Sequence, residues 1–215
     1  MKVKYLAHSS FVITSEKGTK IVLDPYNQNI GLKYAPVNET ADVVLITHDH
    51  PDHNNAAAVK GAQVVKEAGS KDVKGIKIKG ITAPHDEQGG KERGNITIYS
   101  FVVDNVKLCH AGDLGTVLTS KQIEEIGPVD VLFIPVGGFF TLDASAAAKV
   151  CDQIKPRIII PMHYKTAKTD YPIKGVEEFT RGKKNVRQMD SSESEILANK
   201  MPSTAEILVL KPALL

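Results

Sequence analysis

The hydrophobic positions of the first half of the chain fall in short runs, either alternating with polar positions or apolar throughout. Both patterns are typical of β-strands rather than helices. Turns that contain Gly18 and the pair Asp104-Asn105 predict antiparallel hairpins. The predicted strands are Lys2–Ala7, Phe11–Thr14, Lys20–Leu23, Val43–Ile46, Gln63–Val65, Ile76–Thr82, Ile96–Val103 and Val106–Leu108.

In the second half, helical patterns alternate with buried strands. Ser120–Ile126 is predicted as a helix with Ser120 as N-cap, and Asp143–Ile154 as a helix capped by Asp143. The remaining predictions are a helix at Gly175–Arg181 and strands at Val131–Ile134, Arg157–Ile160 and Ala205–Leu210. This order predicts a mixed α/β (α+β) fold with two sheets face to face and helices outside, an αββα sandwich, built as one domain over residues 1–215.

Composition narrows the function only slightly. The chain has 215 residues, 42% of them hydrophobic, and a net charge of +2 from 27 basic and 25 acidic residues. This balance gives no strong field for nucleic acid or an anionic membrane, and no apolar run approaches the length of a membrane span. Cys109 and Cys151 make no disulfide framework, and Cys109 is expected to pack at a strand end rather than bind metal. We expect a cytoplasmic protein with a small-molecule substrate, and a homo-oligomer stays open.

The densest chemistry lies in Thr47-His48-Asp49-His50-Pro51-Asp52-His53, directly after the predicted strand at Val43–Ile46. Imidazole and carboxylate groups are the natural ligands of zinc and similar divalent ions. A solvated surface loop is the alternative reading of such a run. The small residues from Asn54 to Val59 predict that a helix follows the loop.

The other histidines also follow predicted strands. His8, His85 and His163 each come after a β-rich run, as do His110 and Asp113 in Cys109-His110-Ala111-Gly112-Asp113. If those strands lie side by side, their ends form one rim on which these side chains converge. Loops at Tyr26–Thr40, Asp86–Arg93 and Thr166–Pro172 follow strand ends as well, and could be substrate walls or ordinary surface connections.

Taken together, these motifs resemble the metallo-β-lactamase-fold hydrolase superfamily over nearly the whole chain. His48-x-His50-x-Asp52-His53 matches its signature, followed in order by His85, Gly112-Asp113 and His163. Further stretches are similar to the ascorbate-6-phosphate-lactonase-like branch: His8-Ser9-Ser10-Phe11, Leu23-Asp24-Pro25, His110-Ala111-Gly112-Asp113, Pro135-Val136-Gly137-Gly138 and Pro161-Met162-His163-Tyr164.

The resemblance implies two adjacent divalent ions, with zinc as first choice and manganese as the alternative. One ion would take His48, His50 and His85, the other Asp52, His53 and His163, and Asp113 would bridge them. Paired ions of this kind activate water for hydrolysis, and Asp52 could shuttle the remaining proton to the leaving group.

Further roles are expected around the ligands, that of Asp24 from the resemblance and the others from the position of the residues in the sequence. Asp24 is expected to support the metal-binding imidazoles from outside the ligand set. His110 is expected either to touch substrate or to be a hydrogen-bonded structural histidine. For His8, a supporting contact in the active site stands beside a purely structural role. Arg93 and Lys165 could hold a phosphate or carboxylate, or be solvated surface residues, and Phe140 could form a pocket wall or part of the core.

We therefore expect a dinuclear metal-dependent hydrolase that acts on a phosphodiester or a lactone-type ester. The resemblance also implies that iron-dependent oxidoreductases of the superfamily carry a carboxylate at position 50, so His50 favours hydrolysis. Asp113 in place of a cysteine favours phosphoesterase and lactonase chemistry over thiolate-using β-lactamases. The alternatives are a nuclease of the same fold and a non-catalytic metal-binding or regulatory protein.

Overall fold

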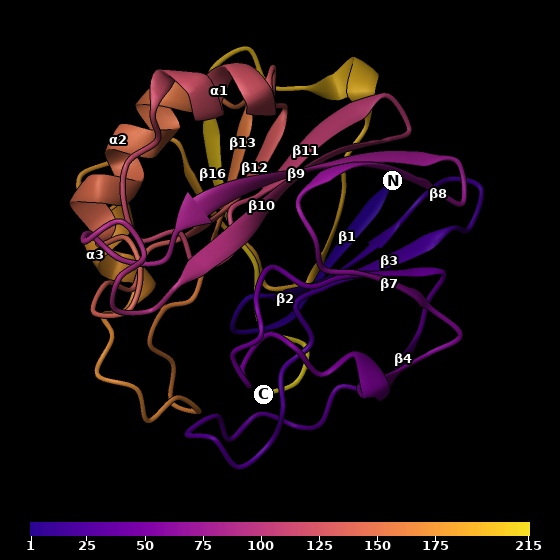
Figure 1. Ribbon diagram of the computed structural model, residues 1–215. Coiled ribbons are helices and arrows are strands. Elements are labelled where there is room, and N and C mark those ends of the chain that lie inside the picture. Colours follow the sequence, from indigo (N-terminus) through magenta and orange to yellow (C-terminus); the bar gives the residue numbers. More distant parts are fainter.

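A computed structural model describes residues 1–215 as two β-sheets packed face to face, with helices on one outer side (Figure 1). The first sheet has six strands, mostly from the first third of the chain. In spatial order they are β15 (Glu193–Glu195), β1 (Lys2–Ala7), β2 (Ser10–Thr14), β3 (Lys20–Leu23), β5 (Val43–Leu45) and β7 (Gln63–Val65). β1, β2 and β3 pair antiparallel, as the turn at Gly18 predicted, whereas β3, β5 and β7 run parallel.

The second sheet has eight strands. In spatial order they are β14 (Val186–Gln188), β16 (Glu206–Val209), β13 (Ile158–Met162), β12 (Val131–Pro135), β11 (Val106–His110), β10 (Asn95–Val103), β9 (Ile76–Pro84) and β8 (Gly69–Val73). β8 to β11 form an antiparallel meander, whereas β11, β12, β13 and β16 run parallel. Two short strands, β4 (Glu39–Thr40) and β6 (Val59–Lys60), pair apart from both sheets.

Parallel neighbours need crossover connections, and the three α-helices lie in them. These are α1 (Ser120–Ile126), α2 (Ala144–Ile154) and α3 (Val176–Thr180), which cover the outer face of the eight-stranded sheet (Figure 1). Asp143 caps α2 as predicted, its side chain accepting from the Ala146 amide. The predicted cap of α1 was wrong by one residue. Thr119 is the N-cap, because Thr119 and Gln122 form a reciprocal capping box that leaves Ser120 inside the first turn.

No α-helix covers the outer face of the six-stranded sheet. An apolar cluster that includes Tyr26, Leu32, Tyr34 and Val37 packs there, contributed by the segment after β3. The helix predicted at Asn54–Val59 is only a 3-10 turn at Ala56–Ala58. Its first turn has no side-chain cap, and Val59 leaves it directly into β6, so no α-helical turn can propagate.

The core lies mainly between the two sheets. Tyr5 and Phe11 from the six-stranded sheet stack at 4.8 Å between ring centroids, and Phe11 meets Phe133 from β12 at 4.7 Å. Forty-nine buried residues form this cluster, which continues beneath the helices. The packing fixes the two sheets against one another, so the strand ends of both sheets meet at one edge. The predicted mixed α/β class with two facing sheets is confirmed, although α-helices form only one of the two outer layers of the predicted αββα sandwich. The shared edge of the sheets is what positions the site.

Candidate metal centre

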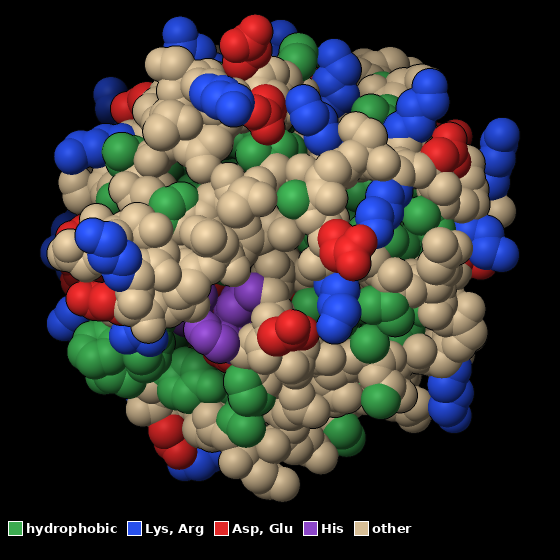
Figure 2. Space-filling view, in the orientation of Figure 1, with side chains coloured by type: hydrophobic (Ala, Val, Ile, Leu, Met, Phe, Trp, Pro, Cys, Tyr) green, Lys and Arg blue, Asp and Glu red, His purple; other side chains and the backbone are tan.

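The predicted ligands lie on turns at one edge of the sandwich, contributed by both sheets. In the six-stranded sheet, His8 follows β1, Asp24 follows β3, and the run from His48 to His53 follows β5. In the eight-stranded sheet, His85 follows β9, Asp113 follows β11 and His163 follows β13. Figure 2 shows histidines at the bottom of a hollow in this part of the surface.

The structure gathers these side chains into three overlapping groups, in each of which the potential ligand atoms lie within 4.8 Å of one another. Each group joins side chains from both sheets, and one of them lies at the outer part of the site. The other two share His53 and lie deeper. The groups are His48 with His50 and His85; His8 with Asp52, His53 and His163; and His48 with His53 and Asp113.

Asp113 lies between the first two groups. Its Oδ2 is 3.6 Å from His85 Nε2 and 3.9 Å from His48 Nε2. The same oxygen is 3.3 Å from His163 Nε2, and Oδ1 is 3.1 Å from His53 Nε2. A buried carboxylate in contact with members of both groups has the position that a bridging ligand requires.

Several of these atoms are buried without a hydrogen-bond partner, among them Nε2 of His53, Nε2 of His163 and Oδ1 of Asp113. A buried polar atom without a partner costs about 1–3 kcal/mol, so three such atoms facing one small volume need a compensating group. Imidazole nitrogens and carboxylate oxygens suit a divalent cation such as zinc. The residues present therefore fit a metal centre.

Burial keeps two of the imidazoles neutral, which is the form that binds metal. It lowers the pKa of His48 to about 3, with His53 adding to the effect, and the pKa of His8 to about 4, with His163 adding. Burial also disfavours charge on His53, but Asp113, Asp52 and Asp24 outweigh it and hold the His53 pKa well above its usual value. A cation bound beside the aspartates would replace the proton on His53.

Asp24 lies beneath the potential ligands and holds them in place through hydrogen bonds. Its Oδ1 accepts from the Thr47 amide at 2.8 Å, and Oδ2 accepts from Thr47 Oγ1 at 2.8 Å and from His53 Nδ1 at 3.0 Å. His110 Nε2 donates to the same Oδ2 at 2.8 Å. Burial opposes ionisation of Asp24, yet these two histidines hold its pKa well below the ordinary value.

The structure places the two histidines whose roles the sequence left open at different distances from the potential ligands. His110 is fully buried behind Asp24 and does not line the pocket described below. His8 stands among the potential ligands, with Nε2 3.2 Å from Asp52 Oδ2. This contact can orient Asp52 and also brings His8 within reach of an ion held by Asp52, His53 and His163.

Three of the site residues sit in strained backbone. His8, Asp24 and His163 have φ of 57°, 40° and 51°, a region that non-glycine residues rarely adopt. The strain is retained because neighbouring segments fix these turns; the His163 amide, for example, donates to the His8 carbonyl at 2.9 Å. Gly115 allows a close approach on the other side, since a Cβ there would lie 2.3 Å from the His85 carbonyl carbon.

A pocket of about 430 Å³ opens beside His85. Arg93 and Phe140, both candidates for substrate contact, line it, and the Arg93 guanidinium carbon lies 4.6 Å from the Phe140 ring centroid. Lys165 does not line it, because Nζ donates to the Tyr171 carbonyl at 2.7 Å. Tyr171 was missed by the sequence motifs, yet its ring lies 5.8 Å from His8 and 5.6 Å from Phe140.

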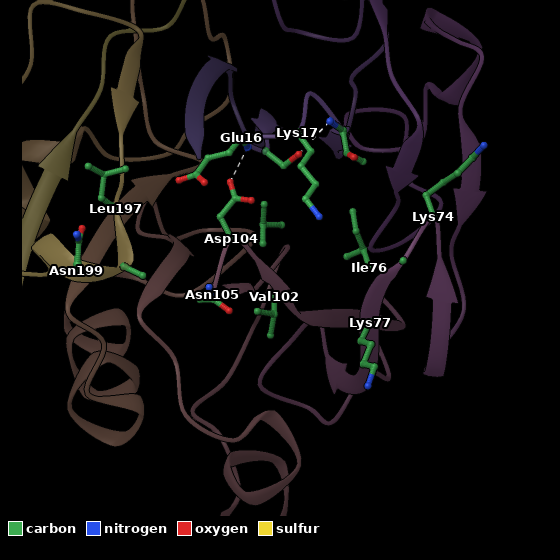
Figure 3. Close-up of a pocket in the computed structure, with 15 residues that line it drawn as sticks. Glu16, Lys17, Lys74, Ile76, Lys77, Val102, Asp104, Asn105, Leu197 and Asn199 are labelled. Atoms are coloured by element: carbon green, nitrogen blue, oxygen red, sulfur yellow. Dashed lines mark hydrogen bonds between the residues drawn. The ribbon is translucent and has the colours of Figure 1, made fainter.

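The largest hollow of the molecule, about 950 Å³, lies elsewhere (Figure 3). It is lined by the turns at Ser15–Thr19 and Asp104–Asn105 and by the start of β9 at Ile76, whereas β9 reaches the metal centre at its other end. No histidine or cysteine lines this hollow. The volume of a hollow therefore does not identify the reactive site in this protein. The convergence of potential ligand atoms identifies it.

Among the helices, none combines the length and the apolar character that crossing a membrane would take.

Residues 2–163 match the β-lactamase superfamily domain. A UPF0173 metal-dependent hydrolase of Thermococcus onnurineus is 33% identical over 193 residues, which cover 77% of this chain and 85% of that protein. One of Pyrococcus horikoshii is 32% identical over 194 residues, with the same coverage of each. A crystal structure from Thermotoga maritima, described as a candidate zinc-dependent hydrolase of the metallo-β-lactamase superfamily, is 34% identical with a TM-score of 0.82 over 97% of both chains.

Proposed function

Because this chain belongs to the β-lactamase superfamily and is a metal-dependent hydrolase, we propose that its site holds two divalent ions and cleaves a phosphodiester or a lactone-type ester. One ion would be held by His48, His50 and His85. The other would be held by Asp52, His53 and His163, with His8 beside them.

The observation that carries the proposal is the position of Asp113. It is 98% shielded from solvent and touches imidazoles of both groups within 4 Å. Two ions, one in each group, would be coordinated by the ring nitrogens that converge from both sides of this carboxylate. Divalent ions held here would lower the pKa of water towards 7 and polarise the bond to be cleaved. Zinc is the first choice and manganese the second, because nitrogen and oxygen donors suit both.

In the hydrolysis, the oxygen of water joins the phosphorus or carbonyl carbon and the bond to the leaving oxygen breaks. The leaving oxygen must then gain a proton. Asp52 is suited to carry it, because its side chain is 13% exposed whereas those of Asp113 and Asp24 are 3% and 0% exposed. His8 donates to Asp52 Oδ2 and so holds the carboxylate in place. We assign His110 the task of orienting Asp24 rather than contacting substrate.

The proposal places this chemistry in the cytoplasm. Both cysteines are free and buried, and burial raises the pKa of Cys109 to about 12, so neither thiol is poised to react. A nuclease of this fold would need a strong basic surface to hold its polymer, and the net charge is only +2.

The test is hydrolysis of bis(p-nitrophenyl) phosphate and of a simple lactone by metal-free protein reloaded with zinc or manganese. Two bound ions per chain, with turnover of one substrate class, are expected. Asp113→Asn should lose turnover by at least about 100-fold, because the shared carboxylate charge is gone while its shape is kept.

Asp42→Asn is the matched control, because Asp42 lies just before β5, at the end away from the ligands, and its carboxylate accepts only from the Lys20 amide. It should retain activity. Two bound ions without turnover of either class would favour a metal-binding or regulatory protein. Fewer than two ions per chain would contradict the assigned ligand sets.

A further inference from the structure

The pocket beside His85 is lined by one Lys or Arg side chain, that of Arg93, and no carboxylate of the protein pairs with it. Its walls come from the loop after β9, which holds Arg93, and from the loop after β12, which holds Phe140. Arg93 is half-buried and makes no ion pair or side-chain hydrogen bond within the protein. Its guanidinium rests on the Phe140 ring instead, at 4.6 Å.

The acidic residues that line the pocket differ in whether their carboxylates already have hydrogen-bond partners. Asp86 is saturated, because its two oxygens accept from the amides of Gln88, Gly90, Glu92 and Arg93 at 2.8–3.0 Å. Asp143 Oδ1 accepts from the Ala146 amide and caps α2. Glu87 and Glu92 also line the pocket, but both are exposed and form no ion pair with Arg93. The Arg93 guanidinium is therefore available to a ligand in this pocket.

Arg93 is preorganised, because contacts within the protein hold it in place before any ligand binds. Asp86 binds the Arg93 amide at 2.8 Å and so fixes the loop from residue 86 to 93 around one carboxylate. The Phe140 ring holds the guanidinium from the other side. An arginine already held in place loses less conformational entropy when it binds an anion.

An aromatic wall connects Arg93 with the metal centre. Phe140 contacts Tyr171 at 5.6 Å between ring centroids, and Tyr171 contacts His8 at 5.8 Å. Figure 2 shows hydrophobic side chains gathered along one side of the hollow that holds the histidines. A substrate lying along this wall would place one part at the ligands and another at Arg93.

We propose that Arg93 recognises a second, anionic group on the substrate, a carboxylate or a phosphate, beside the bond that is cleaved. The guanidinium has a planar fork of donors that matches either oxyanion. This assignment rests on the proposed hydrolase function and makes it narrower: the natural substrate is an anionic ester with an apolar portion.

The experiment compares two lactones, γ-butyrolactone and its ring carboxylate, and two phosphodiesters, methyl p-nitrophenyl phosphate and its carboxymethyl analogue. Zinc- or manganese-loaded wild type should prefer the carboxylated member of whichever pair it cleaves. Arg93→Gln should reduce that preference by about 10- to 100-fold, chiefly through a higher KM for the carboxylated member. Arg93→Lys should restore part of it, because lysine keeps the charge without the fork.

Lys91→Gln is the matched control, since Lys91 is an exposed cation of the same loop that does not line the pocket. It should leave the preference unchanged. An equal loss for both members of a pair, or an unchanged preference in Arg93→Gln, would overturn the assignment.

Failure of the hydrolase proposal can be separated from failure of this one. If wild type cleaves neither pair, calorimetry measures binding of the carboxymethyl phosphodiester by metal-loaded wild type and Arg93→Gln. A Kd about 10- to 100-fold weaker in the variant supports Arg93 as an anion site without hydrolysis. Equal Kd values, or no binding by wild type, overturn it.

Discussion

Replacing Asp24 with asparagine should damage both the apo fold and the metal site. The carboxylate accepts hydrogen bonds from four donors, one on Oδ1 and three on Oδ2. An asparagine can present its carbonyl oxygen at only one of these positions. At least one buried donor must then face an amide nitrogen, which costs about 1–3 kcal/mol in the free energy of unfolding.

The effect on metal binding follows from His53, whose Nδ1 donates to Asp24 at 3.0 Å. Loss of such a supporting carboxylate typically weakens metal affinity about 10- to 100-fold. We expect that loss in Asp24→Asn, measured by competition for zinc with a chromophoric chelator. Urea unfolding of the apo protein measures the expected loss in the free energy of unfolding.

The pH dependence of the free energy of unfolding gives an independent test of the role of Asp24. Because the folded-state pKa of Asp24 is held below its usual value, its stabilisation is present above about pH 4 and fades as pH falls further. Apo wild type should therefore lose more stability in acid than Asp24→Asn. Asp42→Asn is again the control. Zinc affinity within twofold of wild type, together with unchanged apo stability, would refute the bracing role of Asp24.

Three other substitutions probe the fold around the site. Gly115→Ala should cost about 1–3 kcal/mol and weaken metal binding, since the new Cβ meets backbone of His85 and Asp86 at 2.3 Å; thermal unfolding and metal content measure both. Phe133→Ala should cost about 3–5 kcal/mol in urea unfolding, because this fully buried ring packs against Phe11 between the sheets. Lys155→Gly should instead stabilise by about 0.5–1 kcal/mol, because Lys155 ends α2 at φ 55°; a lower urea midpoint would contradict this.

Strands with a clear apolar pattern could be predicted to the residue. Lys2–Ala7, Lys20–Leu23 and Gln63–Val65 have the bounds expected from their hydrophobic runs. β8 (Gly69–Val73) and β15 (Glu193–Glu195) were missed, because they are edge strands with mostly exposed, polar side chains. The small residues near Asn54 suggested a helix, yet propensity alone cannot propagate one where the chain turns at once into β6.

The site, like the fold, was predictable only where local sequence determines the structure. Strand ends predicted which histidines would converge, because local sequence determines where a strand stops. The sequence could not predict which way a side chain faces once two sheets are packed, so the roles of His8 and His110 stayed open until the fold placed His8 among the potential ligands and His110 behind Asp24. Tyr171 and the Asp86 turn gave no motif, since their contacts are with residues or amides placed only by the fold.

Because each ligand group draws side chains from both sheets, an ion bound here would act as a clasp between the two halves of the sandwich. His48 and His50 belong to one half, and His85 belongs to the other. Release of such an ion breaks contacts to both halves, and we expect this edge of the sandwich to open as the ion leaves. The rate of metal release to a chelator should then equal the rate of this opening and be independent of chelator concentration. The residence time of the ion would therefore measure how often the two sheets separate at this edge.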